Sequence, residues 1–218
     1  MTIHIITIFP EIFNSYFNES ILKRAQKNKI IKIKIHDLRK WTTDKHKTVD
    51  DTPYGGGAGM ILKIDSLYKT IKAIKKKKKI KTILLSAKGK TWNQQAVKKY
   101  SKLDEVILIC GRYEGVDERI INFIDEEISI GDYILTGGEI PAMAIVDSIT
   151  RLLPGCLGNA KSAKDESHSR PGYLEYPQYT RPEIFKAGAK TLRVPKILLS
   201  GNHQKIKEWQ EKNSKKVK

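Results

Sequence analysis

The sequence lacks several features that mark common classes of protein. Its two cysteines, Cys110 and Cys156, are too few for a disulfide framework, and one follows an apolar strand-like run, which argues against a zinc site. No apolar run approaches membrane-spanning length, and the N-terminus has neither a basic leader nor a small-residue cleavage site, so we expect a cytoplasmic protein. Metal-ligand spacing is also missing among four of the five histidines, His36, His46, His168 and His203.

Two common nucleotide-binding patterns are missing as well. No G-x-G-x-x-G motif opens a helix, so an ordinary dinucleotide or Rossmann methyltransferase site is not supported. Gly89-Lys90-Thr91 follows a strand-like run, as the end of a phosphate-binding loop would. The glycine that such a loop needs five residues earlier is Leu84, which excludes a P-loop nucleotide triphosphatase.

Positive charge, by contrast, is abundant. The formal net charge is +17, and Lys and Arg neutralise phosphates, so a polyanionic partner is favoured. Lysine far outnumbers arginine and isoleucine is abundant, as an AT-rich coding sequence would produce, so part of the excess reflects mutational bias. We interpret the lysine run at residues 75–79 as a solvated helix end rather than a dedicated contact.

Strand-like and helical patterns alternate along the chain, which predicts an α/β fold with a parallel sheet and helices on both faces. The expected strands lie at residues 3–9, 31–35, 82–86 and 106–110, and the expected helices at 10–25, 67–73, 93–100 and 142–153. A long polar loop covers residues 37–59. We expect a domain over 1–157, a flexible linker over 158–172 and a small helical domain over 173–218, with helices after Arg181-Pro182 and at 202–210.

Glycine-containing loops follow the apolar runs of the predicted sheet. Residues 87–91 follow one run and residues 111–119 another, while residues 129–141 resemble a buried strand crowded with three glycines before Pro141 opens a helix. Ligands of open α/β sheets bind outside the carboxyl ends of the strands. The sequence therefore predicts a binding site built from these loops.

Several strings in these loops and elsewhere resemble one family. They are FPE at 9–11, TVDDTPYGGGAGM at 48–60, CGRYEG at 110–115, SIGDYILTGGEIP at 129–141 and YTRPE at 179–183. In this order and at compatible spacing they are similar to the bacterial tRNA (guanine-N1)-methyltransferase. The resemblance covers nearly the whole chain.

That resemblance implies a fold and a reaction. The family has the SPOUT fold, in which a parallel sheet ends in a C-terminal trefoil knot, and it transfers a methyl group from S-adenosylmethionine to N1 of the guanine immediately 3′ of the tRNA anticodon. Family members act as homodimers with shared active sites. By motif match, the cofactor-binding residues are Leu85, Gly111, Tyr113, Ile130, Gly131, Asp132, Tyr133, Ile134, Leu135 and Gly138.

The resemblance also suggests catalytic residues. The family's proposed base is an aspartate in the linker, and gap-free counting puts Glu166 in its place with Asp165 as the substitute. Arg151 matches the catalytic arginine, and Glu114 matches a position linked to a magnesium requirement. Basic residues at 44–47 and Arg181 would face the anticodon stem. The chain stops at Lys218, short of typical family members. We therefore expect its tRNA binding to depend more on lysine charge.

Two other functions stay open from the sequence alone. One is a non-catalytic RNA-binding protein that keeps the fold, and the other is a ribosomal RNA methyltransferase of the same class. Binding of S-adenosylmethionine separates the first from an enzyme. The strings at 48–60 and 179–183 favour tRNA over ribosomal RNA.

Overall fold

The computed structural model describes residues 1–76, 80–157 and 166–216, and the chain divides into two compact units, Met1–Gly158 and Asn159–Lys218. Unit 1 contains a five-stranded sheet in the order β2-β1-β6-β5-β7, in which every pair of neighbours is parallel. Its strands are β1 (Thr2–Thr7), β2 (Lys32–Asp37), β5 (Lys81–Thr91), β6 (Glu105–Cys110) and β7 (Glu126–Ser129). The predicted parallel sheet is confirmed.

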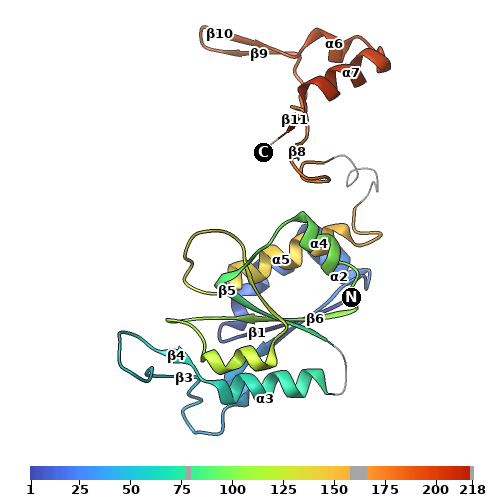
Figure 1. The fold of residues 1–218 in the computed structure, drawn as a ribbon. Helices are drawn as coiled ribbons and strands as arrows, with labels where there is room; N and C mark the ends of the chain where they lie inside the picture. The colour runs from blue at the N-terminus through green and yellow to red at the C-terminus, as the bar shows by residue number, and fades with distance from the viewer. Residues whose placement is uncertain (77–79, 158–165, 217–218) are drawn as a thin grey trace. The chain divides into compact units, whose positions relative to one another are not determined.

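Helices cover both faces of this sheet (Figure 1). One buried cluster joins β1, β5 and β6 to α1 (Asn14–Phe17), α2 (Ser20–Lys27), α4 (Gln94–Tyr100) and α5 (Glu139–Leu152). A second cluster lies on the opposite face, against η2 (Leu38–Trp41), α3 (Ile64–Lys75) and η3 (Glu118–Phe123). The β-branched side chains of the strands alternate between the two clusters, as the two-residue period of a strand requires.

Three further short elements belong to unit 1. The 3-10 helix η1 (Pro10–Phe13) follows β1, and the short strands β3 (Asp50–Asp51) and β4 (Ile61–Leu62) pair antiparallel. The first of these strands lies within the segment 37–59 that was predicted as a long loop, and the second follows shortly after it. Of the lysine run at 75–79, Lys75 ends α3 and lies 3.8 Å from the Asp125 carboxylate, whereas residues 77–79 lie outside the described part of the chain.

Unit 2 has little buried surface and a mixed composition of elements. Its strands are β8 (Tyr173–Leu174), β9 (Ile184–Ala187), β10 (Lys190–Arg193) and β11 (Lys215–Lys216), and its helices are α6 (Lys196–Leu199) and α7 (His203–Asn213). The helix predicted at 202–210 is confirmed by α7. The helix predicted after Arg181-Pro182 is wrong, because β9 and β10 form an antiparallel hairpin there. Trp209 of α7 contacts the rings of Tyr176 and Tyr179, which holds the unit together.

The predicted linker is described only from Glu166 onward. Ser169 donates its backbone N–H to the Glu166 carbonyl, and Ser167 accepts a hydrogen bond at Oγ from the Glu175 N–H at 3.0 Å. These turns attach residues 166–172 to the beginning of β8. Within the described ranges, no helix combines the length and the apolar composition needed to cross a bilayer.

Candidate functional site

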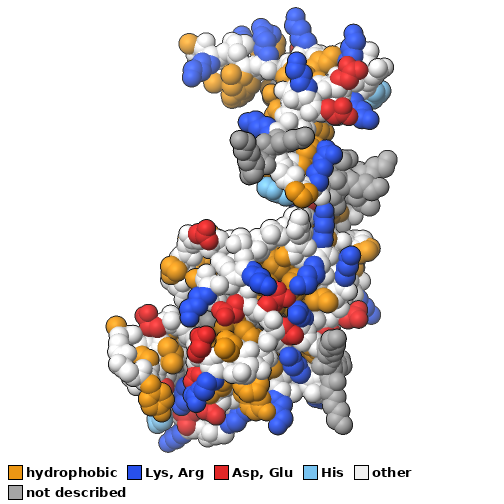
Figure 2. Space-filling model, in the orientation of Figure 1, with side chains coloured by type: hydrophobic (Ala, Val, Ile, Leu, Met, Phe, Trp, Pro, Cys, Tyr) orange, Lys and Arg blue, Asp and Glu red, His pale blue; other side chains and the backbone are white. Residues whose placement is uncertain are grey.

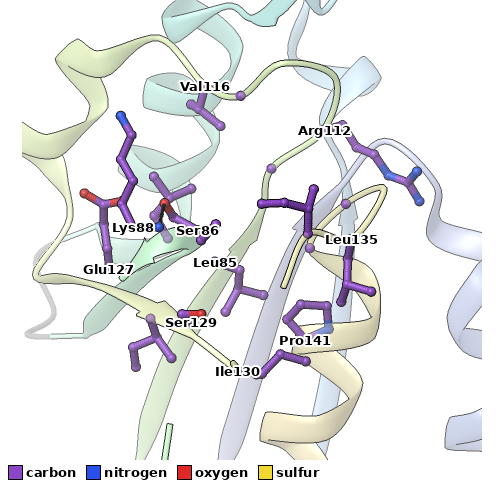
Figure 3. A pocket seen from close by; sticks show the side chains of 18 of the residues that line it. Leu85, Ser86, Lys88, Arg112, Val116, Glu127, Ser129, Ile130, Leu135 and Pro141 are labelled. Atoms are coloured by element: carbon purple, nitrogen blue, oxygen red, sulfur yellow. Dashed lines mark hydrogen bonds between the residues drawn. The ribbon is translucent and has the colours of Figure 1, made fainter. Parts of the chain in front are cut away.

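A cavity of about 300 Å³ opens at the carboxyl ends of β5, β6 and β7. Its walls come from residues 84–88, the loop after β6, the loop after β7 and the first turn of α5. Figure 3 shows the side chains of Leu85, Ile130, Leu135 and Pro141 gathered around it. This is the edge of the sheet at which parallel α/β folds bind ligands, and the three predicted segments all contribute to the cavity there.

The wall formed by β5 differs from the prediction in one respect. Residues 87–91 were expected to form a loop, but β5 continues through Thr91. Ile128 of β7 pairs with Leu85 and again with Lys90, so the strand carries an irregularity between these two residues. Ser86, Ala87 and Lys88 therefore leave the regular ladder and line the cavity.

The loop after β6 is held in place from outside the cavity. Glu114 donates its backbone N–H to the Met60 carbonyl at 3.0 Å, and Leu62 donates to the Gly115 carbonyl at the same distance. The segment after the glycine string at 55–57 thus supports the second cavity loop. Tyr113 has a φ of 60°, which turns the chain back over the cavity.

Residues 130–138 form a loop, and the prediction that 129–141 is a buried strand is wrong. The strand ends at Ser129, whose hydroxyl donates to the Gly131 carbonyl at 2.9 Å and closes a tight turn. Ile134 is 83% exposed, so simple core packing does not explain this apolar residue. The predicted helix follows as α5, with Pro141 in its first turn.

The two glycine-containing loops meet backbone to backbone at Gly138. Its N–H donates to the Gly111 carbonyl at 2.9 Å, and Arg112 and Gly137 form an isolated antiparallel bridge. A Cβ on Gly138 would lie 2.6 Å from the Cys110 Cα, so a side chain cannot be accommodated without moving backbone. Glycine at this position is what lets the loops close around the cavity.

A buried ion pair lies directly beside this contact. The Arg112 Nε donates to Glu139 Oε2 at 2.9 Å, and the Thr7 hydroxyl donates to Glu139 Oε1 at 2.7 Å. Arg112 Nη1 also donates to the Thr136 carbonyl at 3.1 Å, and its guanidinium stacks over the Phe9 ring at 4.7 Å. Glu139 is 1% exposed and would be costly to bury without these partners.

The nearest thiol has no nucleophilic role in this environment. Burial raises the pKa of Cys110 well above its usual value, and the Glu139 carboxylate raises it further. The thiol therefore stays protonated, and a protonated thiol is a poor nucleophile. Cys110 and Cys156 are both free, as the sequence indicated.

Most of the predicted cofactor residues come together in the cavity wall. The ones that line it are Leu85, Gly111, Tyr113, Ile130, Gly131, Tyr133, Ile134, Leu135 and Gly138. Asp132 does not line it and is exposed to solvent. Residues that the sequence reasoning missed are Arg112 and Glu139, together with Ser86, Lys88 and Pro141. Arg112 and Glu139 lie within the quoted strings, but nothing in their spacing indicates that they pair.

Of the predicted catalytic residues, Arg151 belongs to unit 1 and is not among the residues that line this cavity. Arg151 is exposed in the last turn of α5, ten residues after the cavity residue Pro141, which corresponds to about 15 Å along a helix. Glu166 belongs to unit 2, and Asp165 lies outside the described residues. Glu114 lines the cavity, but the described parts of the chain contain no group of three or more His, Cys, Asp or Glu able to hold a metal ion.

Basic side chains predicted to meet RNA are solvent-accessible. Lys45, His46, Lys47 and Arg181 are all exposed. The Asp44 carboxylate accepts hydrogen bonds from the backbone and the hydroxyl of Thr48, which lowers the pKa of Asp44. That carboxylate therefore caps the turn that presents the basic residues.

Comparison with known proteins gives matches along the whole chain. The model of the family described as tRNA (Guanine-1)-methyltransferase TrmD matches residues 1–218. The chain is 52% identical over 214 residues to a tRNA (guanine-N(1)-)-methyltransferase of Dictyoglomus turgidum, covering 98% of this chain and 85% of the relative. It is 50% identical over 218 residues to one from Clostridioides difficile, covering 98% and 92%.

A solved structure agrees with these matches. The crystal structure of tRNA (m1G37) methyltransferase from Aquifex aeolicus superposes with a TM-score of 0.79 at 38% identity, covering 96% of this chain and 87% of the other. The resemblance carried by the loop strings is confirmed. Because the sequence match and the shared fold both extend over the cavity and unit 2, the chain belongs to the tRNA (guanine-1)-methyltransferase TrmD family.

Proposed function

We propose that this protein transfers the methyl group of S-adenosylmethionine to N1 of the guanine immediately 3′ of the tRNA anticodon. The observation that carries the proposal is the cavity at the ends of β5, β6 and β7, formed by the strings that the family shares. A tRNA substrate also places the reaction in the cytoplasm. The net charge of +17 suits a polyanionic substrate, and Figure 2 shows Lys and Arg side chains over the visible faces of both units.

The cavity residues fit a cofactor with an adenosine moiety and a charged sulfur. Leu85, Ile130 and Leu135 provide apolar walls, and the loops around Gly111 and Gly131 provide backbone groups for polar recognition. The cavity volume of about 300 Å³ lies at the lower end of ligand pockets. Bound there, S-adenosylmethionine would supply an electrophilic methyl group on a sulfonium.

We further propose that the loops form a trefoil knot. In support, β7 lies outside β5 in the sheet, yet the next segment returns to make backbone contacts with the loop after β6. α5 then packs on β1 and β6 on the inner side of the sheet. We propose that on this route the chain passes through the loop that leads from β5 to β6, which is the kind of crossing that simple folds avoid.

The chemistry requires a base and a fixed cation. Guanine N1 carries a proton and becomes nucleophilic only when that proton is removed, for which we propose the Glu166 carboxylate, with Asp165 as the substitute. Negative charge then spreads to the guanine O6, and the guanidinium of Arg151 would stabilise it. Both groups act on the tRNA base rather than on the cofactor.

A homodimer would bring these groups to the cavity. Arg151 is about 15 Å along α5 from the cavity wall, so the Arg151 that acts at a given cavity is better supplied by a second copy. Exposed apolar side chains of unit 1, including Phe9, Ile12 and Tyr16, offer a surface for that copy. We propose that each active site is shared between the cavity of one copy and the C-terminal part of the other.

A magnesium ion has a weaker structural basis. Glu114 is one carboxylate, whereas Mg²⁺ prefers six oxygen ligands in octahedral geometry. The donor set among the described residues does not fit a resident ion. We therefore derive no step of the reaction through a metal.

One experiment tests the proposal directly. The protein is incubated with S-adenosylmethionine and tRNA transcripts that carry either guanine or adenine after the anticodon, and the modified base is mapped. Methylation at N1 of the guanine alone is the expected result. Cofactor binding without tRNA methylation would favour ribosomal RNA, and no binding in calorimetric titration would favour a non-catalytic RNA-binding protein.

A further inference from the structure

We propose that Arg112 and Glu139 are positioning residues that set the cofactor affinity of the cavity. They fix the loop at 130–138 against the loop after β6. This inference rests on the proposed function, because it concerns the affinity for S-adenosylmethionine. Neither side chain would bind the cofactor; the pair acts through backbone that does.

The direction of the Arg112 side chain supports a positioning role rather than direct contact with the cofactor. Figure 3 shows Arg112 at the edge of the cavity with its guanidinium directed away from Leu85 and Ile130. Its donors reach Glu139 Oε2 at 2.9 Å and the Thr136 carbonyl at 3.1 Å, and its planar face rests on Phe9. The side chain is thus engaged with the protein through Nε, Nη1 and its planar face.

The hydrogen bonds of Arg112 and Glu139 connect several elements around the cavity. Arg112 belongs to the loop after β6, Thr136 to the loop after β7 and Glu139 to the first turn of α5. Glu139 is in turn bonded to the hydroxyl of Thr7 at the end of β1, and that hydroxyl accepts from the Phe9 N–H at 2.9 Å. One guanidinium therefore ties both cavity loops to the carboxyl ends of the central strands.

The geometry of the guanidinium lets Arg112 hold two acceptors at once. An arginine presents several N–H donors in a rigid fork, so it can serve Glu139 and Thr136 together. A lysine keeps the charge, but its compact ammonium group cannot hold both acceptors in that geometry. Charge and loop position can thus be separated by mutation.

Arg112→Lys is the first test. We expect a melting temperature close to that of the parent, faster amide hydrogen exchange in residues 130–138, and a Kd for S-adenosylmethionine raised about tenfold or more, as for loss of a charge-assisted hydrogen bond. In turnover assays the effect should appear in the KM for the cofactor, with kcat at saturating cofactor changed much less. Arg119→Lys is the matched control, because Arg119 pairs with Asp117 in the same loop on its exposed side, and we expect its Kd to be unchanged.

Two variants that remove charge distinguish an effect on loop position from an effect on protein stability. Arg112→Met leaves the Glu139 carboxylate buried without its cation and should lower the melting temperature by roughly 6–20 °C. The double variant Arg112→Met/Glu139→Gln removes the buried charge and should recover most of that loss. We expect the cofactor affinity to stay weak in the double variant, because the Thr136 carbonyl is still released.

Two results would overturn the inference while leaving the proposed function intact. One is Arg112→Lys binding S-adenosylmethionine as the parent does, and the other is the double variant recovering affinity together with stability. If the parent protein itself failed to bind S-adenosylmethionine, the proposed function would fail first and this inference with it.

Discussion

Replacing Gly138 by alanine should damage both the fold and the cofactor cavity. The added Cβ would lie 2.6 Å from the Cys110 Cα and 3.0 Å from the Gly111 nitrogen, both of them backbone atoms. Carbon atoms prefer separations of about 3.5–4.0 Å, so the loops must separate by about 1 Å. Overpacking of this kind costs about 1–3 kcal/mol, and loss of the Gly138 N–H bond to Gly111 adds about 0.5–1.5 kcal/mol. We therefore expect the free energy of unfolding to fall by about 2–4 kcal/mol.

The cofactor affinity gives an independent measurement of the same displacement. A shift of about 1 Å in a site can cost roughly a hundredfold, so S-adenosylmethionine binding should be lost or greatly weakened. Urea unfolding and calorimetric titration measure the two effects. Gly111→Ala is the control for the unfolding energy alone, because its Cβ would lie 3.5 Å from the Leu85 oxygen and the Val116 side chain, an ordinary contact. Unfolding energy and affinity at parental levels in Gly138→Ala would refute the argument from backbone contact.

Three other predictions concern the base, the substrate and the response to pH. Glu166→Gln should reduce methyl transfer far more than Asp165→Asn, with cofactor binding unchanged in both; the reverse ranking in single-turnover assays would assign the base to Asp165. Affinity for tRNA should fall steeply as salt rises, because lysines release condensed counterions, and a flat plot of log Kd against log salt would contradict this. His36 lies 2.9 Å from the ring of His4, and burial, then Lys34, lowers the pKa of His36 below its usual 6.5. The unfolded chain thus binds more protons there, so stability should be lost as pH falls below about 6.5, and less so in His36→Gln by thermal melts.

Most of the sheet could be predicted because its central strands are buried on both faces. The runs at 82–86 and 106–110 are continuous apolar segments, and they form the buried parts of β5 and β6. The strand β7 was missed because it begins with Glu126 and Glu127, which hide its pattern. Glu126 is tolerated there because the ammonium groups of Lys81 and Lys99 lie 3.5 and 3.4 Å from its carboxylate. The strand was therefore assigned three residues too late, over glycines that form the loop.

The hairpin in unit 2 escaped prediction for a different reason. Every residue of β9 and β10 is exposed, so burial imposes no alternation of apolar and polar residues on the sequence. Pairing is instead set by the backbone ladder between the two strands, from Lys190 opposite Ala187 to Arg193 opposite Ile184. Helix α7 was predictable because Asn202 caps its first turn by accepting from the Lys205 N–H, a signal local to the sequence.

Some features of the cavity could likewise be predicted from the local sequence, whereas others depend on the tertiary fold. Glycines can mark the places where the chain approaches other backbone, and the glycine density of residues 131–138 indicates such a place, as the structure shows at Gly138. The ion pair between Arg112 and Glu139 cannot be recognised from the sequence, because the partners are 27 residues apart, and Thr7 is 132 residues from Glu139. In the sequence, Glu139 resembles an ordinary acidic residue in a first helical turn, favourable to the helix dipole. Only the packing of α5 against β1 and β6 removes it from water, and once buried it requires a cation. The loop that supplies this cation is the one that the glycines bring to within backbone contact, so the close approach at Gly138 and the pairing at Glu139 depend on each other.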